Sequence, residues 1–299
     1  MAHVWEKSYP SGIHWDCLLP PALPLESLLE TAATTWPDRI AVDFYDRTFT
    51  YRELHDLAAR AAKGLQTLGV APGVHVGLHL PNTPHFVICF FAALMAGGRV
   101  VNFSPLAAPR ELKYQLTDAE TKVMITLGLP MLYPQIAALK GAAKFQTLVV
   151  CSIEDFLPAP VARAFGPVAD RVGAAGSEIE FVALIDNDGA FNRHPHSSLE
   201  DEVAVLQYTG GTTGEPKGAM LTHANFCAVL NIFNYWDRNK YLKEWRNKLA
   251  KYEMPTEMEI RASLPKTPVG KLSKKELLAE EMTKRQPVGV LPVSPPEVA

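Results

Sequence analysis

The central part of the chain alternates between short apolar runs and segments of helical periodicity. The apolar runs, at 75–80, 99–103, 122–126 and 146–153, predict strands, and the segments between them, at 83–95, 109–117 and 130–139, predict helices. Strands that alternate with helices through short connections lie parallel in one sheet, with helices on both of its faces. The sequence therefore predicts an α/β fold built on a doubly wound, mainly parallel sheet.

The segment before these units predicts a helix, a hairpin and a second helix. Residues 25–36 predict the first helix, and residues 39–45 and 47–50 predict two strands joined by a turn at Asp46. Thr50, with Glu53 three residues later, has the capping-box pattern that begins a helix, and Gly69 ends it. Further along, residues 178–185 predict another strand.

The composition excludes several classes of function. Hydrophobic residues make up 47%, charged residues 20%, and the net charge is −3, as in an ordinary soluble globular protein with no nucleic-acid surface. The longest apolar run, 86–97, is shorter than the ~20 residues that cross a bilayer, so it predicts a buried helix and leaves peripheral membrane contact open. The four cysteines form no CxxC pair, which favours reduced thiols and a cytoplasmic protein.

Residues 207–225, QYTGGTTGEPKGAMLTHAN, combine glycines, threonines and one lysine. Glycines allow a tight turn that presents backbone N–H groups to an anion, while threonine hydroxyls and Lys217 add donors and positive charge. Pro216 and Gly218 flank the lysine, so the string is not a Walker phosphate loop. The residues alone leave two interpretations, a polyphosphate-binding loop and a flexible glycine turn between a strand and a helix.

The whole string resembles the phosphate-binding signature of the AMP-forming acyl-CoA synthetases, which are adenylate-forming enzymes, and LTHAN resembles their fatty-acyl-CoA ligase branch. FTYRELHDLAARAAKGLQTLGV, FFAALMAGGRVVNFSP and ELKYQLTDAETKVMIT resemble early segments of the same family. The resemblance implies ATP-dependent activation of a fatty or related carboxylic acid to an acyl-adenylate and then an acyl-CoA, with ATP, Mg²⁺ and CoA. It also implies that the phosphates of ATP are held by Thr209, Gly210, Gly211, Thr212, Thr213, Gly214 and Lys217.

A second resemblance lies near the C-terminus. By composition alone, Lys271 is a solvated charge on a polar segment. However, YEMPTEMEIRASLPKTPVGKLSKKEL resembles the closing segment of the same family, in which the lysine of the PKTxxGK string assists adenylation. That position is Lys271. The resemblance implies that its ammonium steadies negative charge between the substrate carboxylate and the α-phosphate.

The central region of the family is missing from this chain. Residues 225–241 contain no YGxTE string with a magnesium glutamate, no Thr-Gly-Asp triplet with a ribose aspartate, and no hinge string. The join at 234–240 therefore indicates an internal deletion relative to the family. The predicted domains are a truncated N-terminal AMP-binding domain at 1–236, a small α+β remnant of the C-terminal lid domain at 241–285, and a disordered tail at 286–299.

Two functions are compatible with these features. One is the acid–thiol ligase activity implied by the family, and the other is a catalytically incompetent remnant that binds at most nucleotide phosphates or a partner. Adenylation requires ATP, metal and carboxylate to be positioned together, which favours the remnant. No metal site is predicted, because His194 and His196 lack a complete ligand set and are expected to be solvated loop residues.

Overall fold

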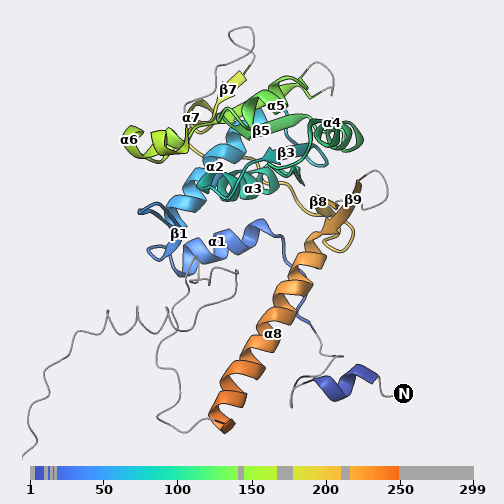
Figure 1. The fold of residues 1–299 in the computed structure, drawn as a ribbon. Helices are drawn as coiled ribbons and strands as arrows, with labels where there is room; N and C mark the ends of the chain where they lie inside the picture. The colour runs from blue at the N-terminus through green and yellow to red at the C-terminus, as the bar shows by residue number, and fades with distance from the viewer. Residues whose placement is uncertain are drawn as a thin grey trace, which may run out of the picture. The chain divides into compact units, whose positions relative to one another are not determined.

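The computed structural model describes residues 4–9, 13, 16, 19–140, 145–166, 178–209 and 216–248, with the backbone alone for 5, 7 and 236–248. The chain divides into two compact units, Met1–Asn239 and Lys240–Ala299. The described elements belong to the first unit (Figure 1), except for the end of helix α8 (His223–Lys248), which crosses the boundary.

The N-terminal part has the predicted helix, hairpin and helix. After a 3₁₀ turn, η1 (Val4–Ser8), come α1 (Glu26–Thr35), the antiparallel strands β1 (Ile40–Phe44) and β2 (Arg47–Thr50), and α2 (Tyr51–Thr67). The capping box is confirmed, because the Glu53 N–H donates to Thr50 Oγ1 over 3.2 Å and the Thr50 N–H donates to the Glu53 carboxylate over 2.8 Å.

Seven strands form the main sheet, in the order β7-β6-β5-β3-β4-β8-β9. They are β3 (His75–His79), β4 (Arg99–Asn102), β5 (Val123–Leu127), β6 (Thr147–Cys151), β7 (Glu178–Glu180), β8 (Val203–Thr209) and β9 (Lys217–Thr222). Every neighbouring pair is parallel except β8 with β9, which is antiparallel. The predicted doubly wound, mainly parallel sheet is confirmed.

Helices cover both faces of this sheet. Along β5, Val123, Ile125 and Leu127 belong to one core, which they share with α1, α2, α3 (Pro84–Met95) and α7 (Phe181–Leu184). Met124 belongs to a second core, shared with α4 (Pro109–Asp118) and α5 (Tyr133–Ala137). Parallel strands that are buried on both faces need this double cover, which explains their nearly continuous apolar sequences.

The chain reverses its direction across the sheet at β3, because β4 lies on one side of β3 and β5 on the other. In open α/β sheets, ligands bind at such a reversal, beyond the carboxyl ends of the strands. A pocket of about 620 Å³ lies at this edge, and none of the described residues that line it is charged. The pocket therefore suits an uncharged group and offers nothing to balance a polyphosphate.

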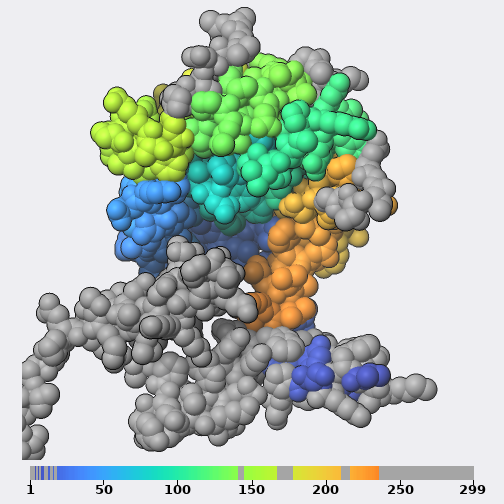
Figure 2. Space-filling view, viewed as in Figure 1, coloured from blue at the N-terminus to red at the C-terminus, as the bar shows by residue number. Residues whose placement is uncertain are grey.

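Aromatic side chains form one wall of this pocket. Phe165, at the end of the 3₁₀ turn η3 (Arg163–Phe165), stacks on Phe44 with ring centroids 6.0 Å apart and meets Tyr45 edge-on at 4.9 Å. Figure 2 shows the two segments in contact, the hairpin in blue and the segment around η3 in yellow-green. The remaining short elements nearby are η2 (Ile153–Asp155) and α6 (Ala159–Ala162).

Three expectations for individual elements differ from the structure. Residues 178–185 form the short strand β7 and then the one-turn helix α7, because Phe181 and Leu184, three residues apart, are both buried on one helical face. The helix expected at 130–139 shortens to α5. Residues 217–222 form strand β9 where the string was expected to lead directly into a helix. Helix α8 continues without a break through the join at 234–240.

None of the described helices combines the length and the apolar character that a membrane span requires.

We expect Thr50→Ala to lower the free energy of unfolding by about 1 kcal/mol, because it leaves the Glu53 N–H without its cap. Chemical denaturation measures the change. Thr34→Ala is the matched control, since Thr34 is an exposed helical residue whose hydroxyl donates to the Glu30 carbonyl, where alanine is a better helix former. Equal losses in the two variants would contradict a specific role for the cap.

Candidate functional site

The β8–β9 hairpin carries two of the predicted phosphate-binding residues at one end. Its register places Thr209 opposite Lys217 and Tyr208 opposite Gly218. Residues directly opposite each other in a ladder share a face of the sheet, so the Thr209 hydroxyl and the Lys217 ammonium lie on one face at the end of the hairpin. Both side chains are exposed. A hydroxyl and an ammonium group are donors that match the oxygens of a polyphosphate.

The other predicted site residues, Gly210, Gly211, Thr212, Thr213, Gly214 and Lys271, lie outside the described residues. The first five lie between Thr209 and Lys217 in the sequence, so the ladder holds both ends of the glycine-rich segment close together, about 5 Å apart. The hairpin thus brings together Thr209 and Lys217. The placement of Lys271 beside them stays a prediction.

The LTHAN ending of the signature has a structural role at the start of α8. Thr222 Oγ1 accepts from the Asn225 N–H over 3.2 Å, and Asn225 Oδ1 accepts from the Thr222 N–H over 3.0 Å. This reciprocal pair satisfies two backbone donors at the helix N-terminus, as a capping box does. His223 is buried, and its Nδ1 accepts from the Leu25 N–H over 3.0 Å. These residues fix the hairpin to α8 and to the start of α1.

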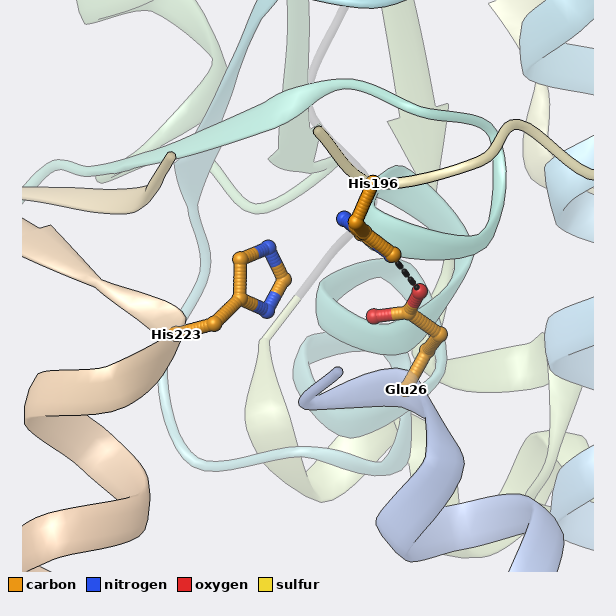
Figure 3. Close-up of side chains that lie close together, drawn as sticks. All are labelled: Glu26, His196 and His223. Atoms are coloured by element: carbon orange, nitrogen blue, oxygen red, sulfur yellow. Dashed lines mark hydrogen bonds and ion pairs between the residues drawn. The ribbon is translucent and has the colours of Figure 1, made fainter. Parts of the chain in front are cut away.

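A cluster of titratable side chains, Glu26, His196 and His223, is shown in Figure 3. His223 directly follows β9, so the cluster lies at the end of the hairpin where Val203 pairs with Thr222, away from Thr209. His196 Nε2 lies 2.7 Å from Glu26 Oε1, and His196 Nδ1 lies 3.2 Å from Glu202 Oε1. The rings of His196 and His223 meet at a centroid distance of 4.8 Å. The expectation that His196 is a solvated loop residue is wrong, because its loop folds back onto α1 and leaves its side chain only 18% exposed.

Glu26, His196 and His223 could also be considered as cation ligands, because each places one ligand atom within 4.8 Å of the others. However, hydrogen bonds already use the nitrogen atoms of these histidines that a cation would need. His223 Nδ1 already accepts from a backbone N–H, so the neutral ring carries its proton on Nε2 and has no lone pair there for a metal. His196 directs Nε2 toward a carboxylate. The arrangement therefore fits a hydrogen-bonded ion-pair network better than a metal centre.

The two histidines of this network have opposite pKa shifts. Burial lowers the pKa of His196, but the hydrogen bond and charge of Glu26, together with Glu202, outweigh it, so that the pKa is raised. Burial also lowers the pKa of His223, and the neighbouring His196 adds to this, so that the pKa of His223 is lowered on balance despite the two glutamates. The surroundings therefore favour the charged form of His196, which lies between two carboxylates, and the neutral form of His223.

Sequence reasoning did not find this cluster. Glu26 and His196 are 170 positions apart, and neither belongs to a motif with a known spacing. The sequence could have indicated this cluster only if the packing of the loop before β8 on α1 were known. That packing depends on tertiary contacts such as the one between Arg193 Nη1 and Glu30 Oε1, at 2.6 Å.

The family is established by comparison with known proteins. A family model described as AMP-binding enzyme matches residues 29–251, which is well over half of the chain. The long-chain-fatty-acid–CoA ligase of Bacillus subtilis is 35% identical over 248 residues, and that of Salmonella typhimurium is 30% identical over 250 residues. The chain belongs to the AMP-binding enzyme family, which confirms the resemblance to AMP-forming acyl-CoA synthetases.

These matches cover most of this chain but less than half of each relative. The B. subtilis alignment spans 78% of the chain and 42% of the ligase, and the S. typhimurium alignment spans 77% and 42%. Among solved structures, a long-chain-fatty-acid–CoA ligase from Archaeoglobus fulgidus shares the fold with a TM-score of 0.55 and 24% identity, covering 72% of this chain and 40% of that one. An anthranilate–CoA ligase in complex with anthranoyl-AMP has a TM-score of 0.56 at 24% identity, over 69% and 36%.

We expect the stability contributed by His196 to depend on pH. Because folding raises its pKa, the stabilisation is fully present below the unfolded pKa of about 6.5 and is lost as the pH rises through the folded pKa. The loss of stability in His196→Asn, relative to wild type, should therefore be larger at about pH 5.5 than at about pH 8.5. Urea denaturation at both pH values measures it.

His194→Asn, two positions away in the same loop, is the matched control for general effects of the substitution. The quantity of interest is the difference between the two variants at each pH. A difference that stays flat, or grows with rising pH, would contradict a charged His196 between Glu26 and Glu202.

Proposed function

We propose that this chain binds the polyphosphate of ATP at the end of the β8–β9 hairpin, as the nucleotide site of an AMP-forming fatty-acid–CoA ligase. The observation that carries the proposal is the register that sets Thr209 opposite Lys217, with the glycine-rich segment 210–215 between them. Backbone N–H groups of a glycine-rich turn, two or more hydroxyls and one ammonium together form a concave set of donors for phosphate oxygens.

The reaction implied by this site has two steps. An oxygen of the fatty carboxylate attacks the α-phosphorus of ATP, the bond to the β-phosphate breaks, and acyl-adenylate and pyrophosphate form. The thiol of CoA then attacks the acyl carbon, loses its proton and releases AMP. In this proposal Thr209, Gly210, Gly211, Thr212, Thr213, Gly214 and Lys217 hold the β- and γ-phosphates, while Lys271 stabilises the charge that develops at the α-phosphate.

This chain offers fewer residues suited to binding Mg²⁺ than to binding the phosphates of ATP. Mg²⁺ prefers carboxylate and phosphate oxygens, and the two described residues at the end of the hairpin, Thr209 and Lys217, supply no carboxylate. The segments expected to carry the magnesium glutamate and the ribose aspartate do not occur in the sequence. Any Mg²⁺ would be held mainly by the phosphates of ATP, so no step is assigned to a protein-bound metal.

A second candidate function is nucleotide-phosphate binding without turnover. The chain spans only 42% of the length of the B. subtilis ligase, and this favours the second candidate. Holding reactants in a productive geometry supplies a large part of an enzymatic rate enhancement. A chain without the adenine and ribose segments could therefore retain phosphate affinity and lose adenylation.

Lys217→Ala should weaken the binding of MgATP by tenfold or more, because a charge-assisted hydrogen bond contributes about 1.5–3 kcal/mol. Isothermal titration calorimetry measures the affinity. Lys122→Ala is the matched control. Lys122 is exposed and lies just before β5, at the amino ends of the parallel strands, whereas Thr209 lies at their carboxyl ends. If the unmodified chain does not bind MgATP, or if both variants bind equally well, the hairpin is not the nucleotide site.

Lys271→Ala separates the two candidate functions. If the chain is a ligase, the unmodified protein should release pyrophosphate when given ATP and a fatty acid, and Lys271→Ala should reduce that release by orders of magnitude while leaving MgATP affinity within about threefold, because its charge acts in the transition state. Binding of MgATP without pyrophosphate release, across fatty, dicarboxylic and aryl acids, would overturn the ligase and support the binding module.

A further inference from the structure

Tyr208 is an unusual residue for the end of an exposed hairpin, because it is only 8% exposed between the exposed residues Gln207 and Thr209. Its ring belongs to the second core, together with Leu112 and Leu116 of α4. The side chain of Tyr208 therefore connects the end of strand β8 to α4, a helix that covers one face of the sheet. Its neighbour in the chain, Thr209, is the first of the predicted phosphate-binding residues.

The ring of Tyr208 lies flat across Gly218, its partner in β9. A Cβ at position 218 would lie 3.1 Å from Cζ of Tyr208 and 3.4 Å from both Cε atoms, closer than side chains normally pack. A larger residue at 218 would push the ring away. Gly218 thus has a packing reason in this chain, in addition to its membership of the glycine-rich string, and the contact holds β9 in register directly beside Lys217.

The hydroxyl of Tyr208 donates to Asp118 Oδ2 over 2.5 Å. Asp118 is the last residue of α4, where the helix dipole disfavours a negative charge, so the bond to Tyr208 compensates a carboxylate in an unfavourable place. Burial, followed by the hydrogen bond and charge of Asp118, raises the pKa of Tyr208, which keeps the donor protonated at physiological pH. Short hydrogen bonds to a charged acceptor are stronger than those between neutral groups.

We propose that Tyr208 is a positioning residue for nucleotide phosphate. Its ring packs on Gly218 in β9 and its hydroxyl bonds to Asp118 in α4, and this clamp fixes the separation of Thr209 and Lys217. The inference rests on the proposed function for its effect on ATP, whereas the clamp itself can be tested without nucleotide. Groups that donate hydrogen bonds to phosphate bind it better when they are preorganised. The two strands that carry them, β8 and β9, are the last pair at one edge of the sheet, where only β4 pairs with β8. A contact that holds this pair in place therefore matters for binding.

The first test compares Tyr208→Phe with Tyr133→Phe. Tyr133 is the matched control because it is also buried and also donates to a carboxylate, Glu178 Oε1 at 2.7 Å, toward the opposite edge of the sheet. Tyr208→Phe should accelerate amide hydrogen exchange in β8 and β9, and Tyr133→Phe should leave those amides unchanged. Equal exchange rates in both variants would overturn the clamp.

The second test measures the affinity for MgATP by calorimetry. Losing one hydrogen bond that orders the site should weaken binding about threefold to tenfold in Tyr208→Phe and leave Tyr133→Phe unchanged. Asp118→Asn, which keeps an acceptor, should retain more affinity than Asp118→Ala. Unchanged affinity in Tyr208→Phe would overturn the positioning role. Absence of MgATP binding by the unmodified chain would overturn the proposed function, and the exchange rates would still decide on the clamp.

Discussion

Burial of a parallel sheet on both of its faces determines where chemistry can occur in this chain. Val100 and Val101 in β4 point to opposite cores, as do Val149 and Val150 in β6, so neither face of the central strands is left for solvent. Polar and charged groups inside such a layer lose their hydration and need a partner within the protein, as buried His79 has in Thr126. Ligand-binding groups are therefore restricted to the carboxyl edge of the sheet and to the hairpin at its end, which is where Thr209 and Lys217 lie.

Strand β9 and the helix α8 that follows it carry exposed apolar side chains. Met220 in β9 is 69% exposed, and Val229 and Phe233 in α8 are 67% and 70% exposed. Elements with few buried apolar contacts open more easily than a core. The polar contacts at the two ends of the hairpin therefore oppose its opening. Tyr208 with Asp118 joins one end of the hairpin to α4, and Glu202 with His196 joins the other end to the loop that contacts Glu26 of α1.

How much the sequence predicted depended on the range of the interactions involved. Strand–helix alternation and the Thr50–Glu53 cap are local, and both were predicted correctly from residues a few positions apart. Strand β9 was not predicted, because Lys217–Thr222 becomes a strand only through pairing with β8. The Glu26–His196 contact, across 170 positions, has no local signal at all. Of the candidate site, residue types suggested phosphate donors and the family resemblance supplied their roles, but the register that sets Thr209 opposite Lys217 required the fold.

Binding and catalysis place different demands on the residues of this site. A contact that is equally strong in substrate and transition state lowers the dissociation constant without accelerating the chemical step. In the proposed site, Thr209 and Lys217 would hold the β- and γ-phosphates in the substrate and also in the transition state, where the leaving pyrophosphate gains charge. Only part of their contribution would therefore be uniform binding. Lys271, beside the developing charge at the α-phosphate, would contribute in the transition state. A chain that keeps the first group but cannot bring the second to it would bind ATP and not consume it. The distinction between a ligase and a nucleotide-binding module therefore depends on two conditions: whether Lys271 reaches the α-phosphate, and whether ATP is positioned for attack without the adenine and ribose segments of the family.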